Sequence, residues 1–358
     1  MLRSTPQSAA AQTSTTWAIV TALGSTVPPR MQDADCVQFL QWALPRLELR
    51  WARFRKVRRQ VCRRIARRLA ELGLSDGAAY RTYIEGNADE WDRLDGFCRI
   101  TISRFWRDPA VFESLRDDVL PALGPTVSVW SAGCASGEEP YSLVLAAAES
   151  GIAVRVLATD VDAALLDRAR TACYPDSSLR GLPPTLRARA FDDGCLRAAY
   201  RGPVEFQRQD VRTAAPGGPF DLVLCRNIVF TYFAERLQAE VGDRLARSLR
   251  PGGALVVGVH EVPALDELEP WPQARGVWRR RYPSGSSARR GVPQAHLRAG
   301  VGSRSMKMSY RRTREHSRVA ATHESPADLH SQACALLLAQ SHSLTDPTYK
   351  PDSSPIGR

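Results

Sequence analysis

Residues 126–162 read TVSVWSAGCASGEEPYSLVLAAAESGIAVRVLATDVD, and this stretch decides the fold. Its opening residues are mostly β-branched or aromatic, which is typical of a buried strand. A loop of small residues follows at 131–137, and Glu138 then begins a helix, where a carboxylate suits the positive end of the helix dipole. A second apolar run, 154–158, leads to Asp160. The pattern predicts one β-α-β unit with a small-residue loop after its first strand and an acid at the end of its second.

A unit of this kind indicates a nucleoside ligand. In a doubly wound sheet the loop approaches the ligand closely, and the acid accepts hydrogen bonds from the ribose hydroxyls. The loop lacks the GxGxxG spacing of a dinucleotide site. The adjacent acids Glu138 and Glu139 suit a cofactor that carries an ammonium and a sulfonium better than one that carries a pyrophosphate. The residues therefore favour S-adenosylmethionine over NAD.

Strand and helix patterns alternate through the rest of the central region. The expected strands cover residues 204–206, 219–225, 254–259 and 277–282, and the expected helices cover 164–172 and 234–249. This alternation predicts an α/β protein with a Rossmann-like, doubly wound, mostly parallel sheet and helices on both faces. Residues 174–202 hold three prolines and no clean period, so we expect an excursion from the sheet there.

Composition divides the chain into four segments. Residues 1–32 are rich in Ala, Ser, Thr and Pro and are expected to form a disordered leader. Residues 33–98 show helical periodicity without strand patterns, which predicts a small all-helical N-terminal domain. Residues 99–282 would form the α/β domain. Residues 283–358 are rich in Ser, Arg, Gly and Pro and are expected to form a disordered basic tail.

The net charge of +11 is unevenly distributed. Residues Arg46–Arg68 carry eleven positive side chains against Glu48 alone, largely on the face opposite the apolar one. One interpretation of this basic helix is a solvated surface. The other is a docking surface for an acidic or glutamate-bearing partner protein. Nucleic-acid binding is expected only through the basic tail, and only without sequence specificity.

Several classes of function are disfavoured by composition. The eight cysteines form no CxxC pair, which predicts reduced thiols rather than a disulfide scaffold or a zinc site. Five of the six histidines follow residue 290, so His260 is the only histidine in the preceding part of the sequence. Chemistry that needs a histidine base or a metal is poorly supplied, and no metal is expected. No apolar run reaches transmembrane length, and we expect a cytoplasmic protein.

Taken together, these motifs resemble the CheR-type protein-glutamate O-methyltransferases, which methylate chemoreceptors. The resemblance runs from about Val37 to Tyr282 and implies the class I methyltransferase type of sheet. Its most specific parts are WSAGCASGEEPYS at 130–142, ATDVD at 158–162, FD at 220–221 and CRN at 225–227. A basic helical segment before the junction TISRFWRD, which begins at Thr101, also resembles the family's N-terminal helical domain.

The resemblance implies a set of residues that bind S-adenosylmethionine across the strand ends. Glu138 would meet the methionine end, Asp160 the ribose and Asp210 the adenine. The complete set is Thr101, Ser103, Arg107, Ala132, Gly133, Glu138, Asp160, Asp210, Val211, Asn227 and Ile228. Asn227 and Ile228 would form the loop that closes over the cofactor.

Arg107 and Tyr232 are the catalytic candidates. A glutamate acceptor needs no strong base, because its carboxylate is ionised near neutral pH. It needs placement in line with the methyl group, exclusion of water and a cation that holds it. Arg107, implied to lie nearest the methyl, would supply that cation, and Tyr232 would orient the acceptor. The alternative for Arg107 is a structural ion pair with Asp108 or Glu138.

Three features depart from the family pattern. The tyrosine expected four residues after Asn227 is replaced by Thr231, and Tyr232 comes one residue later. The excursion at 174–202 is shorter than the family's receptor-gripping β-subdomain. Gly-Val-His-Glu at 258–261 replaces the usual Gly-His-Ser-Glu.

Other functions stay open at this point. One is a methyltransferase that acts on RNA or a small acid. Another is a binding module without turnover that recruits an acidic partner through its basic helix. A nicotinamide oxidoreductase is the last alternative, because the loop lacks the pyrophosphate fingerprint.

Overall fold

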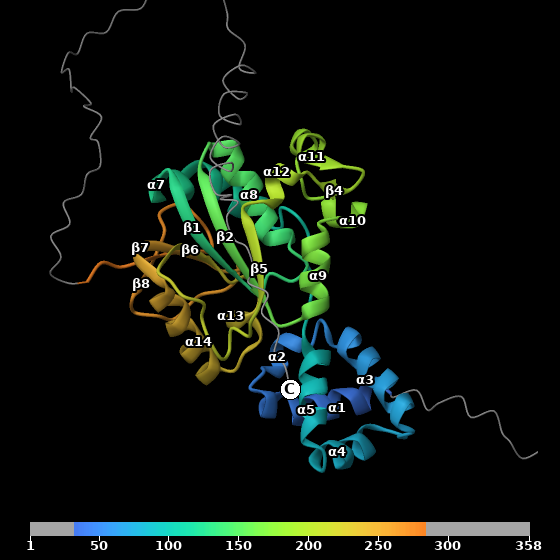
Figure 1. Ribbon diagram of the computed structural model, residues 1–358. Helices are drawn as coiled ribbons and strands as arrows, with labels where there is room; N and C mark the ends of the chain where they lie inside the picture. The colour runs from blue at the N-terminus through green and yellow to red at the C-terminus, as the bar shows by residue number, and fades with distance from the viewer. Residues whose placement is uncertain (1–31, 284–358) are drawn as a thin grey trace, which may run out of the picture. The chain divides into compact units, whose positions relative to one another are not determined.

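The computed structural model describes residues 32–283 (Figure 1). The leader predicted for residues 1–32 and the tail predicted for 283–358 lie outside the described residues, except for one residue each. The described chain begins with a group of helices and continues into a twisted sheet flanked by helices. No helix in the described part is both long and apolar enough to cross a bilayer.

The N-terminal part is entirely helical apart from an isolated bridge at Leu49. Its elements are α1 (Asp33–Ala43), η1 (Leu44–Leu47), α2 (Trp51–Phe54), α3 (Arg58–Leu72), α4 (Gly77–Glu85) and α5 (Ala88–Cys98). Helix α3 buries Val61, Ile65 and Leu69 at helical spacing. It ends at Gly73, whose positive φ of 68° suits the left-handed cap. The predicted helical N-terminal part is therefore present.

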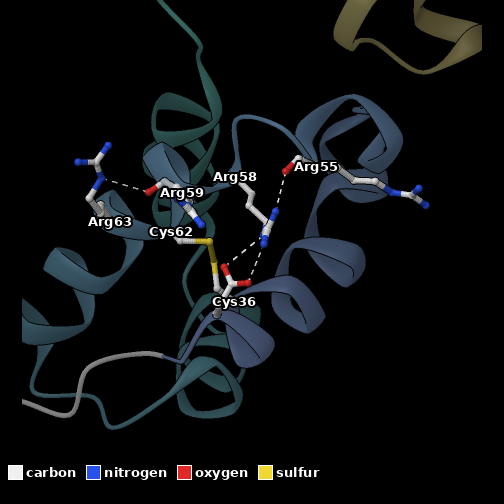
Figure 2. The surroundings of a disulfide bond; sticks show 7 residues. Cys36, Arg55, Arg58, Arg59, Cys62 and Arg63 are labelled. Atoms are coloured by element: carbon white, nitrogen blue, oxygen red, sulfur yellow. Dashed lines mark hydrogen bonds and ion pairs between the residues drawn. A yellow bond between two sulfur atoms is a disulfide. The ribbon is translucent and has the colours of Figure 1, made fainter.

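Two disulfides correct the prediction of reduced thiols. Cys36 of α1 bonds to Cys62 of α3, and Cys173 bonds to Cys195. Figure 2 shows the first bond beneath the arginines of α3. The prediction was wrong for these four cysteines because 26 and 22 residues separate the partners. No local spacing pattern encodes such pairs, whereas helix packing brings the Cα atoms of Cys36 and Cys62 to 5.9 Å.

A seven-stranded sheet forms the centre of the rest of the described chain. The strands lie in the order β5-β2-β1-β6-β7-β9-β8. The first five are mutually parallel, β9 is antiparallel to β7, and β8 is antiparallel to β9. Their bounds are β1 (Thr126–Ala132), β2 (Ala153–Asp160), β5 (Val204–Arg208), β6 (Phe220–Leu224), β7 (Leu249–Val256), β8 (Leu268–Pro270) and β9 (Val277–Arg280). The predicted mostly parallel sheet is confirmed.

Helices cover both faces of this sheet. Successive residues of a strand point to opposite faces, and the buried strands carry apolar side chains on both. Val127 and Val129 of β1 belong to the hydrophobic cluster that contains α8 (Glu138–Ser150). Trp130 of the same strand belongs to the cluster that contains α14 (Glu235–Ser248). The other helices outside residues 174–202 are α6 (Pro109–Ser114), η2 (Leu115–Val119), α7 (Leu120–Leu123), α9 (Ala163–Thr171) and α13 (Val229–Tyr232). The fold is doubly wound, as predicted.

The excursion predicted at 174–202 lies outside the main sheet. It consists of α10 (Asp176–Leu179), α11 (Pro184–Ala190), β3 (Phe191–Asp192), β4 (Cys195–Leu196) and α12 (Ala198–Arg201). The strands β3 and β4 pair only with each other in a hairpin of two residues a side. The Cys173–Cys195 bond ties this hairpin to the end of α9.

We expect the double variant Cys36→Ser/Cys62→Ser to unfold at a lower urea concentration than the wild type. The bond joins residues that lie 26 positions apart in the chain. Removing a cross-link that closes a loop of that length lowers the free energy of unfolding by about 3 kcal/mol. Urea unfolding followed by circular dichroism, in buffer without reductant, measures the difference. Addition of dithiothreitol is the control, because it should make the two curves coincide. Identical curves in the absence of reductant would contradict a bond between α1 and α3.

Candidate functional site

The candidate site lies where the chain reverses its direction of travel across the sheet. Strand β1 lies between β2 and β6, so the chain adds β2 and β5 on one side of β1 and β6 and β7 on the other. Loops after such neighbouring strands separate at their carboxyl ends and leave a crevice for a ligand. Gly133 follows β1, Asp160 ends β2, and Asn227 lies in the loop after β6. The structure therefore brings the three loops together at one edge of the sheet.

Two adjoining cavities occupy this edge. The larger one extends toward the helical part and is lined by Phe54, Asp95, Arg99, Thr101, Gly133, Asp160, Asp210, Val211, Arg212, Ile228 and Tyr232, among others. The smaller one lies along the loop that follows α5 and is lined by Thr101, Ser103, Arg104, Arg107, Gly133, Glu139, Arg226, Asn227 and Ile228, among others. Thr101, Gly133 and Ile228 border both, so the two cavities share one wall.

Glycine suits the backbone conformation at that shared wall. The φ of Gly133 is +74°, and a Cβ at this position would lie 2.0 Å from Cδ1 of Ile228. Asn227 also has a positive φ, 59°, and its backbone N–H donates to Oε2 of Glu261 at 2.8 Å. The same carboxylate accepts from the Gly258 N–H and from the Thr231 hydroxyl. Glu261 thus holds the turn after β6, and the unusual residues at 259 and 260 leave this carboxylate in place.

Asp160 lines the larger cavity with a firmly oriented carboxylate. Oδ2 accepts from the Ala135 N–H and Oδ1 from the Asp162 N–H, both at 2.9 Å. Burial raises the pKa of Asp160, and these two hydrogen bonds oppose that shift. Each carboxylate oxygen keeps a lone pair after accepting one backbone bond. The pair of oxygens therefore suits two adjacent hydroxyl groups, as a ribose presents.

The other end of the larger cavity is closed by an ionic network. Arg212 donates to Asp210, which follows β5, and to Asp95 of α5 at 2.8 and 3.0 Å. Burial raises the pKa of Asp210, but the hydrogen bonds from Arg212 outweigh this effect and the net shift is downward. Val211 is buried beside the pair and lines the cavity with other apolar side chains, including Phe54. Apolar walls with a few polar groups at the rim fit a flat purine base.

The two adjacent acids at the start of α8 point in different directions. The carboxylate of Glu138 accepts from Ser136 and Ser178 at 2.8 and 3.2 Å, and Glu138 lines neither cavity. Glu139 lines the smaller cavity and accepts from the Ser131 hydroxyl at 3.0 Å. Burial raises the pKa of Glu139, and the positive charge of Arg226 opposes that shift. Of the two adjacent acids, Glu139 therefore lines a cavity and Glu138 does not.

Arg107 lines the smaller cavity, and its Nη1 donates to the Ile102 carbonyl at 2.9 Å. Among the described residues no carboxylate lies within ion-pair distance of Arg107. Asp108, its proposed structural partner, instead binds Arg226. The other proposed partner, Glu138, binds the two serines named above. The alternative interpretation of Arg107 as half of a structural ion pair with either acid is therefore not supported.

Tyr232 lies in the wall of the larger cavity despite its displaced sequence position. Its ring packs on Phe54 with 5.1 Å between centroids. Burial raises the pKa of Tyr232, and the positive charge of Arg107 opposes that shift. Thr231, at the position where the family has its tyrosine, instead bonds to Glu261. The extra residue in this turn thus leaves a tyrosine facing the crevice.

Ten of the twelve residues expected at the site border the two cavities, and Ala132 and Glu138 do not. Ala132 is the buried last residue of β1. The sequence argument named Glu139 with Glu138 as acids suited to the cofactor, but the set implied by the resemblance omitted Glu139. That set also omitted Arg226, Glu261 and the pair Asp95–Arg212. Arg226 and Glu139 lie within quoted motifs, so a search for partners of buried charges could have found them.

Comparisons with known proteins agree with this geometry. The model of the CheR methyltransferase SAM-binding domain matches residues 101–272. A probable chemotaxis protein methyltransferase of Rhizobium etli is 30% identical over 223 residues, which cover 56% of this chain and 83% of the relative. The chemotaxis protein methyltransferase of Escherichia coli is 31% identical over 220 residues, 57% of this chain and 76% of the relative. That of Listeria monocytogenes is 34% identical over 181 residues, 48% of this chain and 68% of the relative.

The residues at the sheet edge fit the cofactor of that family. The larger cavity offers a paired acceptor at Asp160 and apolar walls for a base, and the smaller offers a carboxylate at Glu139 for an ammonium group. Neither cavity has the helix-terminal glycine fingerprint that a pyrophosphate needs. The chain therefore belongs to the CheR methyltransferase family and is an S-adenosylmethionine-dependent methyltransferase.

Proposed function

We propose that the chain methylates the side-chain carboxylate of a glutamate in an acceptor protein of a chemotaxis-type signalling system. The observation that carries this proposal is the guanidinium of Arg107. It lines the smaller cavity and has no carboxylate partner among residues 32–283. A cation in that position suits an acceptor that is already negatively charged. The relatives' names support the type of signalling system.

The cofactor would extend through both cavities. Asp160 would accept from the ribose hydroxyls, and Asp210 with Val211 would border the adenine. The ammonium of the methionine end would pair with Glu139 rather than with Glu138, because Glu139 lines the smaller cavity. When bound, S-adenosylmethionine supplies a methyl group on a positively charged sulfur. Gly133 allows the backbone after β1 to approach that ligand closely.

Arg107 would hold the acceptor carboxylate in line with this methyl group. A carboxylate oxygen would form the new bond to carbon as the carbon–sulfur bond breaks and its electron pair stays on sulfur. No proton moves, because the glutamate is ionised at neutral pH. Tyr232, Phe54 and Ile228 would exclude water from the reacting groups, which strengthens the hold of Arg107 on the carboxylate.

The acceptor protein would dock on the exposed side of α3 and the residues before it. The basic face consists of Arg53, Arg55, Lys56, Arg59, Arg63 and Arg67, all of them exposed. Arg59, Arg63 and Arg67 recur every four residues within α3, which places them along one side of that helix, and Arg53, Arg55 and Lys56 precede it. Figure 2 shows Arg55 and Arg63 directed away from the Cys36–Cys62 bond.

Other arginines of the same basic segment serve the fold. Arg58 pairs with Asp33, Arg68 with Glu90, and Arg64 donates to two backbone carbonyls at the C-terminal end of α5. No member of the basic face forms an ion pair within the described part of the chain. The face therefore has unneutralised charge for an acidic partner, and long-range attraction would speed the encounter.

The nature of the product tests the proposed reaction. We expect the purified protein to transfer label from methyl-tritiated S-adenosylmethionine to a protein in membranes of the host cell. A glutamate methyl ester should release the label as methanol under mild alkali, because esters hydrolyse where N-methyl groups persist. Labelled RNA, or label that survives alkali, would contradict methylation of a carboxylate.

Arg107→Ala should reduce methyl transfer by at least about a hundredfold, because a cation aimed at the reacting carboxylate is lost. Affinity for the cofactor product S-adenosylhomocysteine should stay within about tenfold, since the ribose and adenine contacts remain. Calorimetry measures the affinity, and label transfer measures the rate. Arg107→Lys is the matched variant and should retain part of the activity. Unchanged transfer by Arg107→Ala would remove this residue from the mechanism.

Charge reversal tests the basic face. Arg59→Glu/Arg63→Glu should raise KM for the acceptor protein by about tenfold at low salt, with kcat nearly unchanged, because docking is weakened and chemistry is not. Added salt should raise KM of the wild type toward that of the variant. Arg168→Glu is the control, since Arg168 of α9 is exposed and forms no ion pair in the described structure. Equal effects of both changes would argue against docking at α3.

A further inference from the structure

Arg226 is the most deeply buried guanidinium that borders the smaller cavity. It lies two residues beyond the end of β6, and its side chain is 2% exposed. A charge buried to this extent is stable only when other groups compensate for its lost hydration. Its Nε has no hydrogen-bond partner among the described residues. Compensation therefore comes through the two terminal nitrogens and the ring of Phe112, whose centroid lies 5.3 Å from Cζ.

The terminal nitrogens join three segments of the chain. Nη2 donates to the Arg107 carbonyl at 2.9 Å and to the Asp108 carboxylate at 2.6 Å. Nη1 lies 3.7 Å from Oε2 of Glu139 in the first turn of α8. One side chain thus connects the end of β6 with the loop that carries the acceptor-binding cation and with the carboxylate proposed to bind the cofactor.

The loop around Arg107 needs such a connection. Trp106 and Asp108 both have positive φ, 55° and 62°, which is unfavourable for residues other than glycine. On one side the loop is held by the Trp106 N–H, which donates to the Ser142 hydroxyl at 2.9 Å. On the other side Arg226 donates to the carbonyl of Arg107 and to the side chain of Asp108. Arg107 therefore extends from a backbone held on both sides.

We propose that Arg226 is a positioning residue for methyl transfer, which holds the Arg107 loop over the cavity and faces Glu139 with a fixed positive charge. This role rests on the proposed function, because it assigns Arg107 to the acceptor and Glu139 to the cofactor. Arg226 itself acts through these two residues. It couples the acceptor side of the site to the cofactor side.

The electrostatics of Glu139 support the second half of this role. Burial raises its pKa, and Arg226 is the largest opposing influence, followed by the Ser131 hydroxyl and Arg107, while Glu261 adds to the rise. The nearby titratable groups also include the carboxyls of Asp108 and Glu138 and the thiols of Cys134 and Cys225, and burial raises the pKa values of these two thiols. Loss of the Arg226 charge would raise the pKa of Glu139 further. The ionised form would then persist only at higher pH.

Two substitutions separate the two parts of the role. Arg226→Met fills similar space without charge or hydrogen bonds. Arg226→Lys keeps the positive charge but lacks the two terminal nitrogens with which the guanidinium binds two groups at once. Arg226→Met should lower kcat about a hundredfold, as expected when a reacting group is misplaced by about 1 Å. It should also raise the pH midpoint for S-adenosylhomocysteine binding, that is, the pH below which binding is lost. Arg226→Lys should restore that midpoint but not kcat.

Asp108→Asn provides an independent variant, should Arg226→Met fail to fold. It weakens the link between Arg226 and the loop without changing the charge that faces Glu139. We expect a lower kcat and an unchanged pH midpoint for cofactor-product binding. Circular dichroism confirms the fold of each variant. A wild-type kcat in Asp108→Asn would overturn the positioning of the loop, and a wild-type midpoint in Arg226→Met would overturn the electrostatic effect on Glu139.

The test also separates this proposal from the proposed function. If the wild type transfers no methyl group to any glutamate, the assignment of the acceptor fails. The pH midpoint for binding of S-adenosylhomocysteine, measured by calorimetry, would still report whether Arg226 controls Glu139. Retained transfer by the wild type with no effect of Arg226→Met on kcat or midpoint would refute only the positioning role.

Discussion

Removing charged groups from water is the constraint on which this site depends. Arg226 and Glu261 are buried at the carboxyl edge of the sheet, and Glu139 is half-buried there. A buried charge is stable only with partners, and here the partners come from other loops. Arg226 reaches the loop at Asp108, and Glu261 reaches the turn at Asn227. The same interactions that stabilise these charges therefore fix the loops that form the cavities.

The helical part is joined to the sheet by interactions of the same kind. Arg50 donates from its side chain to the carbonyls of Phe230 and Thr231, in the turn that leads to Tyr232. Asp95 of α5 accepts from Arg212, which also holds Asp210 at the far end of the larger cavity. The cavity proposed for the adenine is thus completed by a helix of the N-terminal part. The N-terminal helices therefore contribute to the proposed cofactor site as well as to the proposed docking surface.

The basic segment shows why a charge count alone is ambiguous. Periodicity identified one helix with arginines opposite its apolar stripe, and both interpretations of that pattern were compatible with it. In the structure some of these arginines bind carboxylates or carbonyls of neighbouring elements, as Arg68 binds Glu90. Others, such as Arg59 and Arg63, remain exposed. The elements packed against the helix decide which arginines bind neighbouring groups and which remain exposed.

The sequence alone determined the order and type of the elements and the edge of the sheet that binds the ligand. Strand and helix patterns are local, because side-chain direction follows a fixed period within each element. The small-residue loop before Glu138 and the acid at Asp160 are equally local, since both follow directly from a strand in the β-α-β unit. These features sufficed to predict the doubly wound fold and the cofactor, and the resemblance to a known family implied most of the residues around the crevice.

Only the tertiary structure decided which side chains meet. It turned the side chain of Glu139 toward a cavity and that of Glu138 toward Ser136 and Ser178, although the two acids are adjacent in the sequence. It paired Cys36 with Cys62 and gave Arg226 its contacts with Asp108 and Glu139. These outcomes depend on distances between elements far apart in the chain. Periodicity specifies which face of an element is buried, but the partners of a buried charge or thiol are set by the elements packed against that face.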